Sequence, residues 1–319
     1  MNLIATTMLL GAAVLALRLN AARADATGAD AARVQPSLQT FLEEGRPVSS
    51  LEIDNDSLLF SRADSFYTSG LRISRAYRLN TADGWRFAGW RLGQQLYTPS
   101  DVRIPPGRLN PLDRPYAGWL YGGFFYTVVD TDGSELAFGL DVGCLGPCAG
   151  GRVTQSFIHK IFDQPEPRGW SSQQTNEPGV VLRVGGRAPF WRFHPNADLR
   201  AGMSLRAGNI FTDLSAEATL RAGRLQLSNE GAALYGFARG SLRAVGYDAT
   251  LQGGLFSDKE ARSVRPKRVT AEWEWGLQWQ QRSWAWRLSV VRRGNEIDGL
   301  SESLGRQDFL RLVISYFPQ

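Results

Sequence analysis

Apolar and polar residues alternate with a period of two through much of this chain. In residues 273–280, every odd position is large and apolar, and every even position is small or polar. Because successive side chains of a β-strand point to opposite faces, this period predicts strands that each have one apolar face. The same alternation, in places weaker, runs through residues 85–97, 119–129, 197–207, 216–226, 235–249, 283–290 and 310–316.

Turn residues separate these strands, for example Asp83-Gly84 and Asp132-Gly133, and they predict hairpins. Two architectures have strands of this kind: a soluble sandwich, and a barrel whose apolar face meets lipid. We expect the barrel, because tryptophans gather on the apolar faces of neighbouring strands as in the aromatic girdle of outer-membrane barrels. At roughly 25 residues per strand and connection, the chain predicts an all-β antiparallel transmembrane barrel of about 12 strands. The tryptophans in question are Trp273, Trp275, Trp279, Trp284 and Trp286.

The first residues predict export. Residues 3–17 are apolar and are followed by Ala22-Arg23-Ala24, so residues 1–24 are expected to be a signal peptide cleaved after Ala24. An uncleaved membrane anchor is the alternative, although the apolar run is short for a span. Residues 25–50 are polar and predict a flexible N-terminal segment, which leaves residues 51–319 as the barrel domain.

The charge of the chain permits an anionic partner. The 319 residues carry a formal net charge of +5, and only Lys160, Lys259 and Lys267 among the 36 basic residues are lysines. Arginine suits bidentate contact with phosphate, so phosphorylated lipid and nucleic acid both fit this composition. A GC-rich genome would explain the arginine excess equally well, and the basic residues form no tract.

Cys144 and Cys148 are the two cysteines of the chain. An exported chain meets oxidising conditions, so a local disulfide across the turn at Gly146-Pro147 is expected, with two free thiols as the alternative.

Two histidines are available as bases. Gln155 and His159 are four residues apart, and a short helix would place them on one face. His159 is therefore either a base in a functional loop or a solvated surface residue. His194 lies in an aromatic, hairpin-like stretch without acidic or hydroxyl neighbours, which predicts an interfacial or turn position.

Residues 54–57, Asp-Asn-Asp-Ser, interrupt an apolar strand with oxygen-bearing side chains. Such oxygens suit a hard cation such as Ca²⁺, although a polar barrel interior or a turn would have the same composition. Neighbouring strand residues point to opposite faces. Asn55 and Asp56 can therefore share a site only at a strand end or a bulge, unless one of them acts through another residue.

A series of short motifs follows in order along residues 51–180, and together the motifs resemble the lipid A 3'-O-deacylases, the LpxR family of outer-membrane enzymes. The later strands match this family in pattern only. The motifs are Asn55-Asp56 with residues 57–60, then residues 66–72, 97–99, 113–121 and 143–150, Gln155 with His159, Gly169-Trp170, and residues 176–178.

The resemblance implies a 12-stranded barrel whose active site lies between the outer wall and a helix from an extracellular loop. It implies an enzyme of the bacterial outer membrane that hydrolyses an acyl ester of lipid A with Ca²⁺, and no nucleic-acid partner. In this reading His159 is the general base, Asp56 is a metal ligand, and Asn55 and Thr68 are ligands or positioning groups. The chain has no Gly-x-Ser-x-Gly nucleophile motif, and water would be the nucleophile.

One position departs from the family. Characterised members have a catalytically implicated lysine near the position of Ile104, and this chain has none there. Arg103 is the expected substitute and a candidate to bind substrate phosphate, with Arg108, Arg152 and Arg168 as further candidates at the rim. A phospholipid acyl hydrolase and a non-catalytic barrel are the alternative functions.

Overall fold

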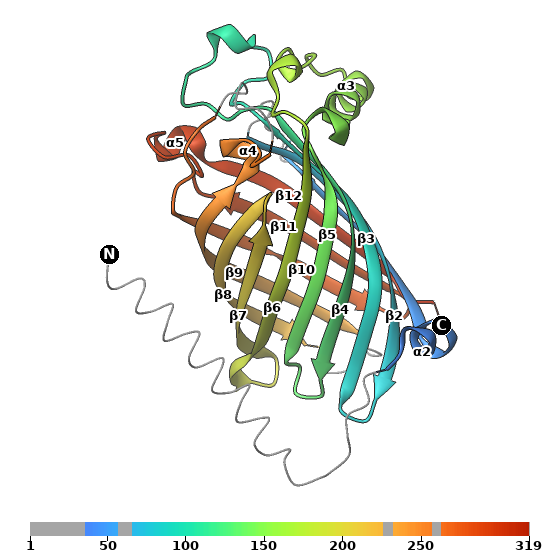
Figure 1. Ribbon diagram of the computed structural model, residues 1–319. Coiled ribbons are helices and arrows are strands. Elements are labelled where there is room, and N and C mark those ends of the chain that lie inside the picture. Colours follow the sequence, from blue (N-terminus) through green and yellow to red (C-terminus); the bar gives the residue numbers. More distant parts are fainter. Residues whose placement is uncertain (1–35, 57–65, 226–231, 257–262, 319) are drawn as a thin grey trace.

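The computed structural model describes residues 36–56, 66–225, 232–256 and 263–318, and within them twelve strands close into one antiparallel barrel (Figure 1). Each strand pairs with the next along the chain, and the first pairs with the last. The predicted all-β barrel is confirmed. The strands are β1 (Arg46–Asn55), β2 (Phe66–Thr81), β3 (Gly84–Thr98), β4 (Ala117–Asp130), β5 (Glu135–Leu145), β6 (Glu177–His194), β7 (Ala197–Gly208), β8 (Phe211–Arg224), β9 (Ala233–Asp248), β10 (Val269–Gln281), β11 (Trp284–Arg293) and β12 (Gln307–Tyr316).

Short helical segments lie in the connections and before β1. Among the described residues, no helix is long and apolar enough to cross a membrane. The segments are α2 (Leu38–Glu44), η2 (Pro106–Arg108), η3 (Pro147–Ala149), α3 (Gly151–Ile161), η4 (Trp170–Ser172), α4 (Ala249–Gln252) and α5 (Glu302–Gly305).

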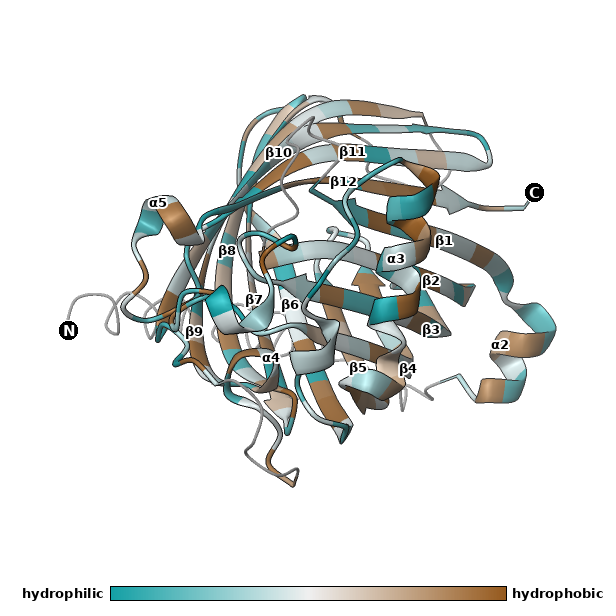
Figure 2. Cartoon of the chain, turned by 90° about the horizontal axis from the view of Figure 1, so that it is seen from above, coloured by the Kyte–Doolittle hydropathy of each residue, from teal (hydrophilic) through white to brown (hydrophobic). Residues whose placement is uncertain are grey.

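The alternating pattern sorts side chains between the two sides of the barrel wall. On β10, Trp273 and Leu277 are each 60% exposed, whereas Glu274 between them is buried. Polar positions in the strands therefore face the lumen, and apolar positions form an outward belt, visible as brown bands on the strands in Figure 2. A closed ring of paired strands with an apolar exterior meets the requirement of lipid that no backbone group is left unpaired.

The two ends of the barrel differ in the length of their connections. Two residues join β2 to β3 and four join β4 to β5, at the two predicted hairpins. At the opposite end, residues 99–116, 146–176 and 294–306 form long loops, and the described residues 249–256 and 263–268 also lie there, at the top of Figure 1. Outer-membrane barrels have short periplasmic turns and longer extracellular loops, so we assign the loop end to the cell exterior.

The N-terminal part of the described chain is folded. The boundary expected at residue 51 lies inside β1, which begins at Arg46, and α2 precedes it. Helix α2 lies outside the ring at the periplasmic end (Figure 2), where Phe41 packs edge-on against Tyr126 with ring centres 6.0 Å apart. The predicted signal peptide, residues 1–24, lies outside the described residues.

Aromatic side chains fill the lumen near the extracellular end. Trp119 stacks on Tyr121 with ring centres 5.8 Å apart, and Tyr67 packs against Tyr97 and Phe309. All five side chains are buried. This cluster is the main hydrophobic core, and it lies inside the barrel beneath the loops.

Ion pairs occupy the lumen below this cluster. Asp141 accepts from Arg91 at 2.7 Å and from Arg183 at 2.5 Å, and Glu274 accepts from Arg239 at 2.9 Å and from Arg287 at 3.1 Å. Such charges are stable inside a protein only when they are paired and hydrogen-bonded. The polar faces predicted from the sequence therefore form a cross-linked interior, with cavities of about 430 and 450 Å³ between the side chains.

We predict that Asp141→Ala destabilises the barrel by about 3 kcal/mol, because it leaves two partly buried guanidinium groups without their buried carboxylate. Urea unfolding of the protein in phospholipid vesicles measures the effect. The control is Asp308→Ala, which removes the partner of Arg292 from a half-exposed pair and is expected to cost less than about 1 kcal/mol. Equal losses in the two variants would contradict this account of the interior.

Candidate active site

One part of the outer wall is covered by protein. On the outward face of β3, Leu92 is 49% exposed, but Leu96 and Thr98 further along the same face are buried. The loop between β5 and β6 covers this area, and the side-chain amide of Gln94 donates to the carbonyl of Ala149 in that loop at 2.7 Å. The covered patch lies at the extracellular end.

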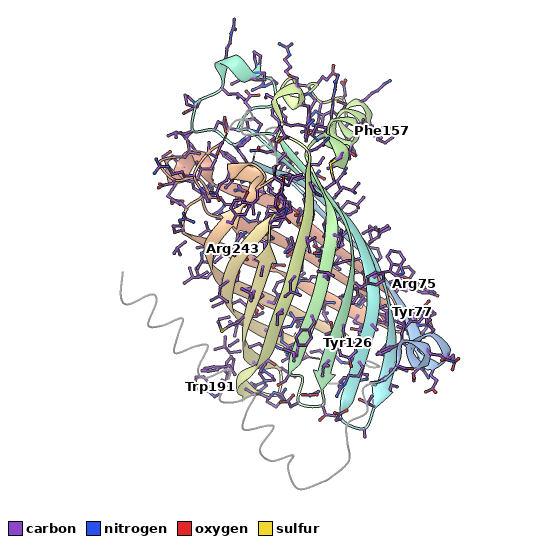
Figure 3. The ribbon with its side chains drawn as sticks, viewed as in Figure 1. Arg75, Tyr77, Tyr126, Phe157, Trp191 and Arg243 are labelled. Atoms are coloured by element: carbon purple, nitrogen blue, oxygen red, sulfur yellow. A yellow bond between two sulfur atoms is a disulfide. The ribbon has the colours of Figure 1, made fainter. Side chains whose placement is uncertain are left out.

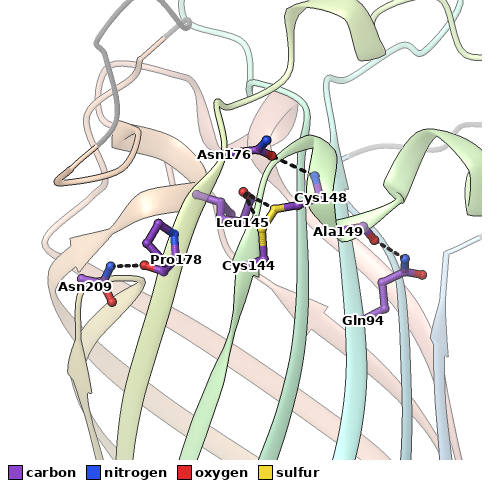
Figure 4. Close-up of a disulfide and its surroundings, with 8 residues drawn as sticks. All are labelled: Gln94, Cys144, Leu145, Cys148, Ala149, Asn176, Pro178 and Asn209. Carbon is purple, nitrogen blue, oxygen red and sulfur yellow. Dashed lines mark hydrogen bonds between the residues drawn. A yellow bond between two sulfur atoms is a disulfide. The ribbon is translucent and has the colours of Figure 1, made fainter.

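A disulfide fixes the start of this loop. Cys144 at the end of β5 is bonded to Cys148 in η3 (Figure 4), so the predicted disulfide is confirmed and the free-thiol alternative is wrong. The N–H of Cys148 also donates to the Asn176 side chain at 2.8 Å, which ties the start of the loop to its end. Helix α3 therefore emerges from a rigid base beside the wall.

Helix α3 lies close to the wall because of Gly151 and Trp170. A Cβ at Gly151 would lie 2.5 Å from the Trp170 ring, so a larger residue would push the helix away. The Trp170 indole N–H donates to the Gln155 side-chain oxygen at 2.7 Å. Its ring packs on Tyr116, with ring centres 5.0 Å apart, and belongs to one buried cluster with Leu96 of the wall.

The polar face of α3 is its buried face. Gln155 and His159 are both buried, on one side of the helix as the four-residue spacing predicts, whereas Phe157 points away from the barrel (Figure 3). The solvated alternative for His159 is therefore wrong. Burial of polar side chains against the wall, with apolar side chains outward, reverses the usual order of a helix on a water-soluble protein.

The ring of His159 is oriented by the chain that follows α3. The helix ends with a left-handed residue, Asp163, at φ 52°, and the N–H of Gln164 donates to the His159 carbonyl at 2.8 Å. This reversal, a Schellman-type end, brings the carbonyl oxygen of Pro165 to 2.5 Å from Nδ1 of His159. A carbonyl only accepts, so Nδ1 carries the proton, and Nε2 is the basic nitrogen of the neutral ring.

Asn55, Asp56 and Thr68 meet where β1 and β2 begin to separate. Asn55 is the last residue of β1, so the strand end that was one of the predicted alternatives is present, and the β2–β3 register shifts at Thr68 on the neighbouring strand. The N–H of Asp56 donates to the Thr68 carbonyl at 3.4 Å. The hydroxyls of Thr68 and Thr98 lie 2.6 Å apart, which places Thr68 in the covered patch of β3.

Asp54 belongs to a different environment. Its carboxylate accepts two hydrogen bonds from Arg311, both at 2.8 Å, and one from Tyr67 at 3.0 Å, on the lumen side of the wall. Asp54 of the predicted four-residue polar cluster therefore faces the lumen. Ser57 lies outside the described residues.

The donor atoms near Asp56 are oxygens. An amide, a carboxylate and a hydroxyl come from Asn55, Asp56 and Thr68, and hard cations such as Ca²⁺ prefer these ligands. Within the described part of the chain, no group of three or more His, Cys, Asp or Glu residues is arranged to hold a metal ion. The donor chemistry thus fits a calcium ion that also takes neutral oxygens.

Arg103 lies on the exposed surface of the β3–β4 loop. Its guanidinium pairs with Asp101 at 2.7 and 2.9 Å, and this hydrogen bonding lowers the pKa of the Asp101 carboxyl. The neighbouring carbonyl of Val102 accepts from the Arg168 N–H at 2.9 Å. Arg103 therefore stands where its loop meets the segment that follows α3.

His194 lies far from this site. It ends β6 at the exposed periplasmic turn, where Nδ1 accepts from the Asn196 N–H at 3.1 Å, so the predicted turn position is confirmed.

The structure thus gathers most predicted residues around one covered patch. The backbones of Asp56 and Thr68 are hydrogen-bonded, the Thr68 hydroxyl contacts that of Thr98 on β3, and α3 with His159 packs on β3 and β4. The chemical roles of these residues stay predictions. From the sequence, no role was assigned to Trp170, Tyr116 or Thr98. Tyr116 and Trp170 are aromatic residues in otherwise polar loops, and that contrast could have indicated that they pack against the site.

Comparisons with known proteins agree with the barrel fold. The sequence matches the family model described as "Outer membrane protein LpxR" over residues 9–312, and no curated protein sequence matches it. Among solved structures, LpxR from Salmonella typhimurium is similar with a TM-score of 0.70 at 22% identity, over 85% of this chain and 100% of that chain. The β-domain of the Bordetella autotransporter BrkA has a TM-score of 0.47 at 14% identity, over 85% of this chain and 98% of that chain.

We predict that neutral His159 carries its proton on Nδ1, because of the Pro165 carbonyl. Long-range proton–nitrogen correlation spectra of the protein in detergent micelles report the tautomer of each ring. The chain has two histidines, so His194→Gln leaves the His159 signals alone in the spectrum. Spectra in which Nδ1 of His159 is the unprotonated nitrogen would contradict the prediction.

Proposed function

The chain belongs to the LpxR family of outer-membrane proteins, and from that premise we propose that it is a lipid A 3'-O-deacylase. The reaction is hydrolysis of an acyl ester of lipid A in the outer membrane. The observation that carries the proposal is the buried His159 ring, held by Pro165 with Nε2 as its basic nitrogen, between a loop helix and the outer wall.

The location of the site supports a lipid substrate. The covered patch continues the outward face on which Leu92 is exposed, so a molecule in the membrane reaches it sideways along the wall. The lumen, by contrast, is crossed by ion pairs such as Arg91–Asp141 and closed by aromatic rings, which disfavours the alternative of a non-catalytic pore.

The residues of the site permit hydrolysis by activated water. Nε2 of His159 takes a proton from water as the water oxygen bonds to the acyl carbon. The ester bond to the sugar oxygen then breaks, and the His159 proton passes to that oxygen, which gives a fatty acid and a free hydroxyl. General base catalysis of this kind contributes roughly 10²–10⁴-fold to a rate.

Asn55, Asp56 and Thr68 are proposed to hold a calcium ion beside the ester, with Asp56 as the charged ligand. When bound, such an ion supplies positive charge that stabilises the developing oxyanion. The buried Thr68–Thr98 hydroxyl pair and the Asp56–Thr68 backbone bond keep these oxygens in place. Their fixed positions matter because displacement of a catalytic group by about 1 Å lowers the rate by roughly 100-fold.

Arg103 is proposed to bind a phosphate of lipid A in place of the family lysine. Its guanidinium is exposed and has the geometry to bind a phosphate through two hydrogen bonds, and its ion pair with the partly exposed Asp101 is weak enough to be exchanged for one with phosphate.

We predict that cells producing the wild-type protein contain lipid A that has lost the mass of one acyl or acyloxyacyl group, and that His159→Ala abolishes this loss. Mass spectrometry of extracted lipid A measures it. Lys160→Ala is the matched control, because Lys160 is the exposed neighbour of His159 on α3, and it should retain the mass loss.

Two outcomes would contradict the proposal. Unchanged lipid A with a folded wild-type protein would favour a non-catalytic barrel. Fatty acid released from glycerophospholipid vesicles, with lipid A intact, would identify a phospholipid hydrolase.

We predict that deacylation in micelles stops when Ca²⁺ is chelated and returns when it is added back. Asp56→Asn should weaken the apparent calcium affinity by about 100-fold or more, since removal of even indirect metal partners costs roughly 10–100-fold. Asp54→Asn is the control, because that carboxylate faces the lumen. The same calcium dependence in the two variants would contradict the assigned ligand.

A further inference from the structure

Helix α3 presents large apolar side chains away from the protein. Val153, Phe157 and Ile161 are 73%, 64% and 59% exposed, and Phe162 directly after the helix is 66% exposed. Their spacing of four residues places the first three on one stripe. Nothing in the described chain packs over this stripe, although its members are the residue types that soluble helices bury.

This stripe adjoins the lipid-facing belt of the barrel. Gln94, which holds the loop immediately before α3, is paired in register with Leu120 of β4, and Leu120 is exposed. Leu92 and Val142 come next on the same outward face and are also exposed. Successive outward side chains of a strand are two residues, or roughly 7 Å, apart. The first residues of α3 therefore lie about 7 Å from side chains that face lipid.

Charged residues border the stripe. Arg152 lies in the first turn of the helix and Lys160 lies near its end, and both are exposed. Long basic side chains beside an apolar stripe are typical of helices that lie at a membrane surface, because their charged ends extend to the head groups.

We propose that α3 is docked in the outer leaflet, with Val153, Phe157, Ile161 and Phe162 in the hydrocarbon. The occupant of this surface is membrane lipid rather than a second protein, because the stripe lies outside the wall and is continuous with the lipid-facing belt. Helices of this kind bury their apolar face roughly 5–10 Å below the head groups. The inference does not depend on the proposed hydrolysis.

Docking of this kind has one consequence if the proposed function holds. The same helix then contacts lipid with one face and holds His159 against the wall with the other. A lipid ester reaches His159 from the side of the barrel while its acyl chains stay in the leaflet.

Site-directed spin labelling tests the docking. The native cysteines are bonded to each other, so an introduced thiol is labelled selectively. The full chain with Phe157→Cys is labelled with a nitroxide and folded into phosphatidylethanolamine–phosphatidylglycerol vesicles. Collision rates with oxygen and with a water-soluble nickel chelate are then measured. We expect the oxygen-to-nickel ratio at position 157 to approach that of Leu92→Cys in the belt.

Matched positions make the result decisive. Glu166→Cys in the following loop should show a ratio several-fold lower, because its label stays in water. Val153→Cys and Ile161→Cys repeat the test on the stripe, and the heat-dependent gel mobility of barrels shows which variants are folded.

Two results would overturn the docking. A nickel accessibility at position 157 equal to that at Glu166 would place the helix in water. Spin–spin broadening between labelled copies that disappears on dilution with unlabelled protein would show that a second copy covers the stripe. Failure of lipid A deacylation would leave the collision ratios unchanged, so the two proposals fail separately.

Discussion

The closed barrel imposes the constraint on which the rest of this structure depends, because every strand residue must face either lipid or lumen. Polar chemistry in the lumen is out of reach of a membrane lipid, and polar chemistry on the exterior would be exposed to hydrocarbon. The covered patch on β2 and β3 resolves this conflict. There the β5–β6 loop packs on Leu96, and Thr68 and Thr98 beside it are buried, so the wall can hold polar groups on its lipid side.

The same constraint separates neighbouring residues into different roles. Asp54 pairs with Arg311 inside the lumen, while Asn55 and Asp56 come at the end of the strand, where alternation no longer applies. Tyr67 points into the aromatic core, and Thr68 at the bulge points to the patch. Asp54 and Tyr67, which stabilise the barrel from the lumen, are thus immediate sequence neighbours of Asn55 and Thr68, to which chemical roles are assigned.

The sequence predicted what depends on periodicity and spacing. Alternation identified the barrel, and the four-residue spacing of Gln155 and His159 identified their shared helix face. The start of β1 at Arg46 was missed because residues 46–50 carry little alternation. The Pro165 carbonyl that orients His159 was also missed, since backbone contacts after a helix end leave no side-chain pattern. Trp170 was given no role because its side-chain contact with Gln155 joins residues 15 positions apart, across a loop that has no periodic pattern.

The central claim is that an acyl ester is cut outside the barrel wall, under α3. A crystal structure of His159→Asn with intact lipid A bound tests it most directly. We expect an acyl ester carbon between α3 and the outer faces of β2 and β3, separated from residue 159 by one water molecule, with roughly 3 Å for each hydrogen bond. Lipid A bound elsewhere on the belt, or at the mouth of the lumen, with the space beneath α3 closed, would contradict it.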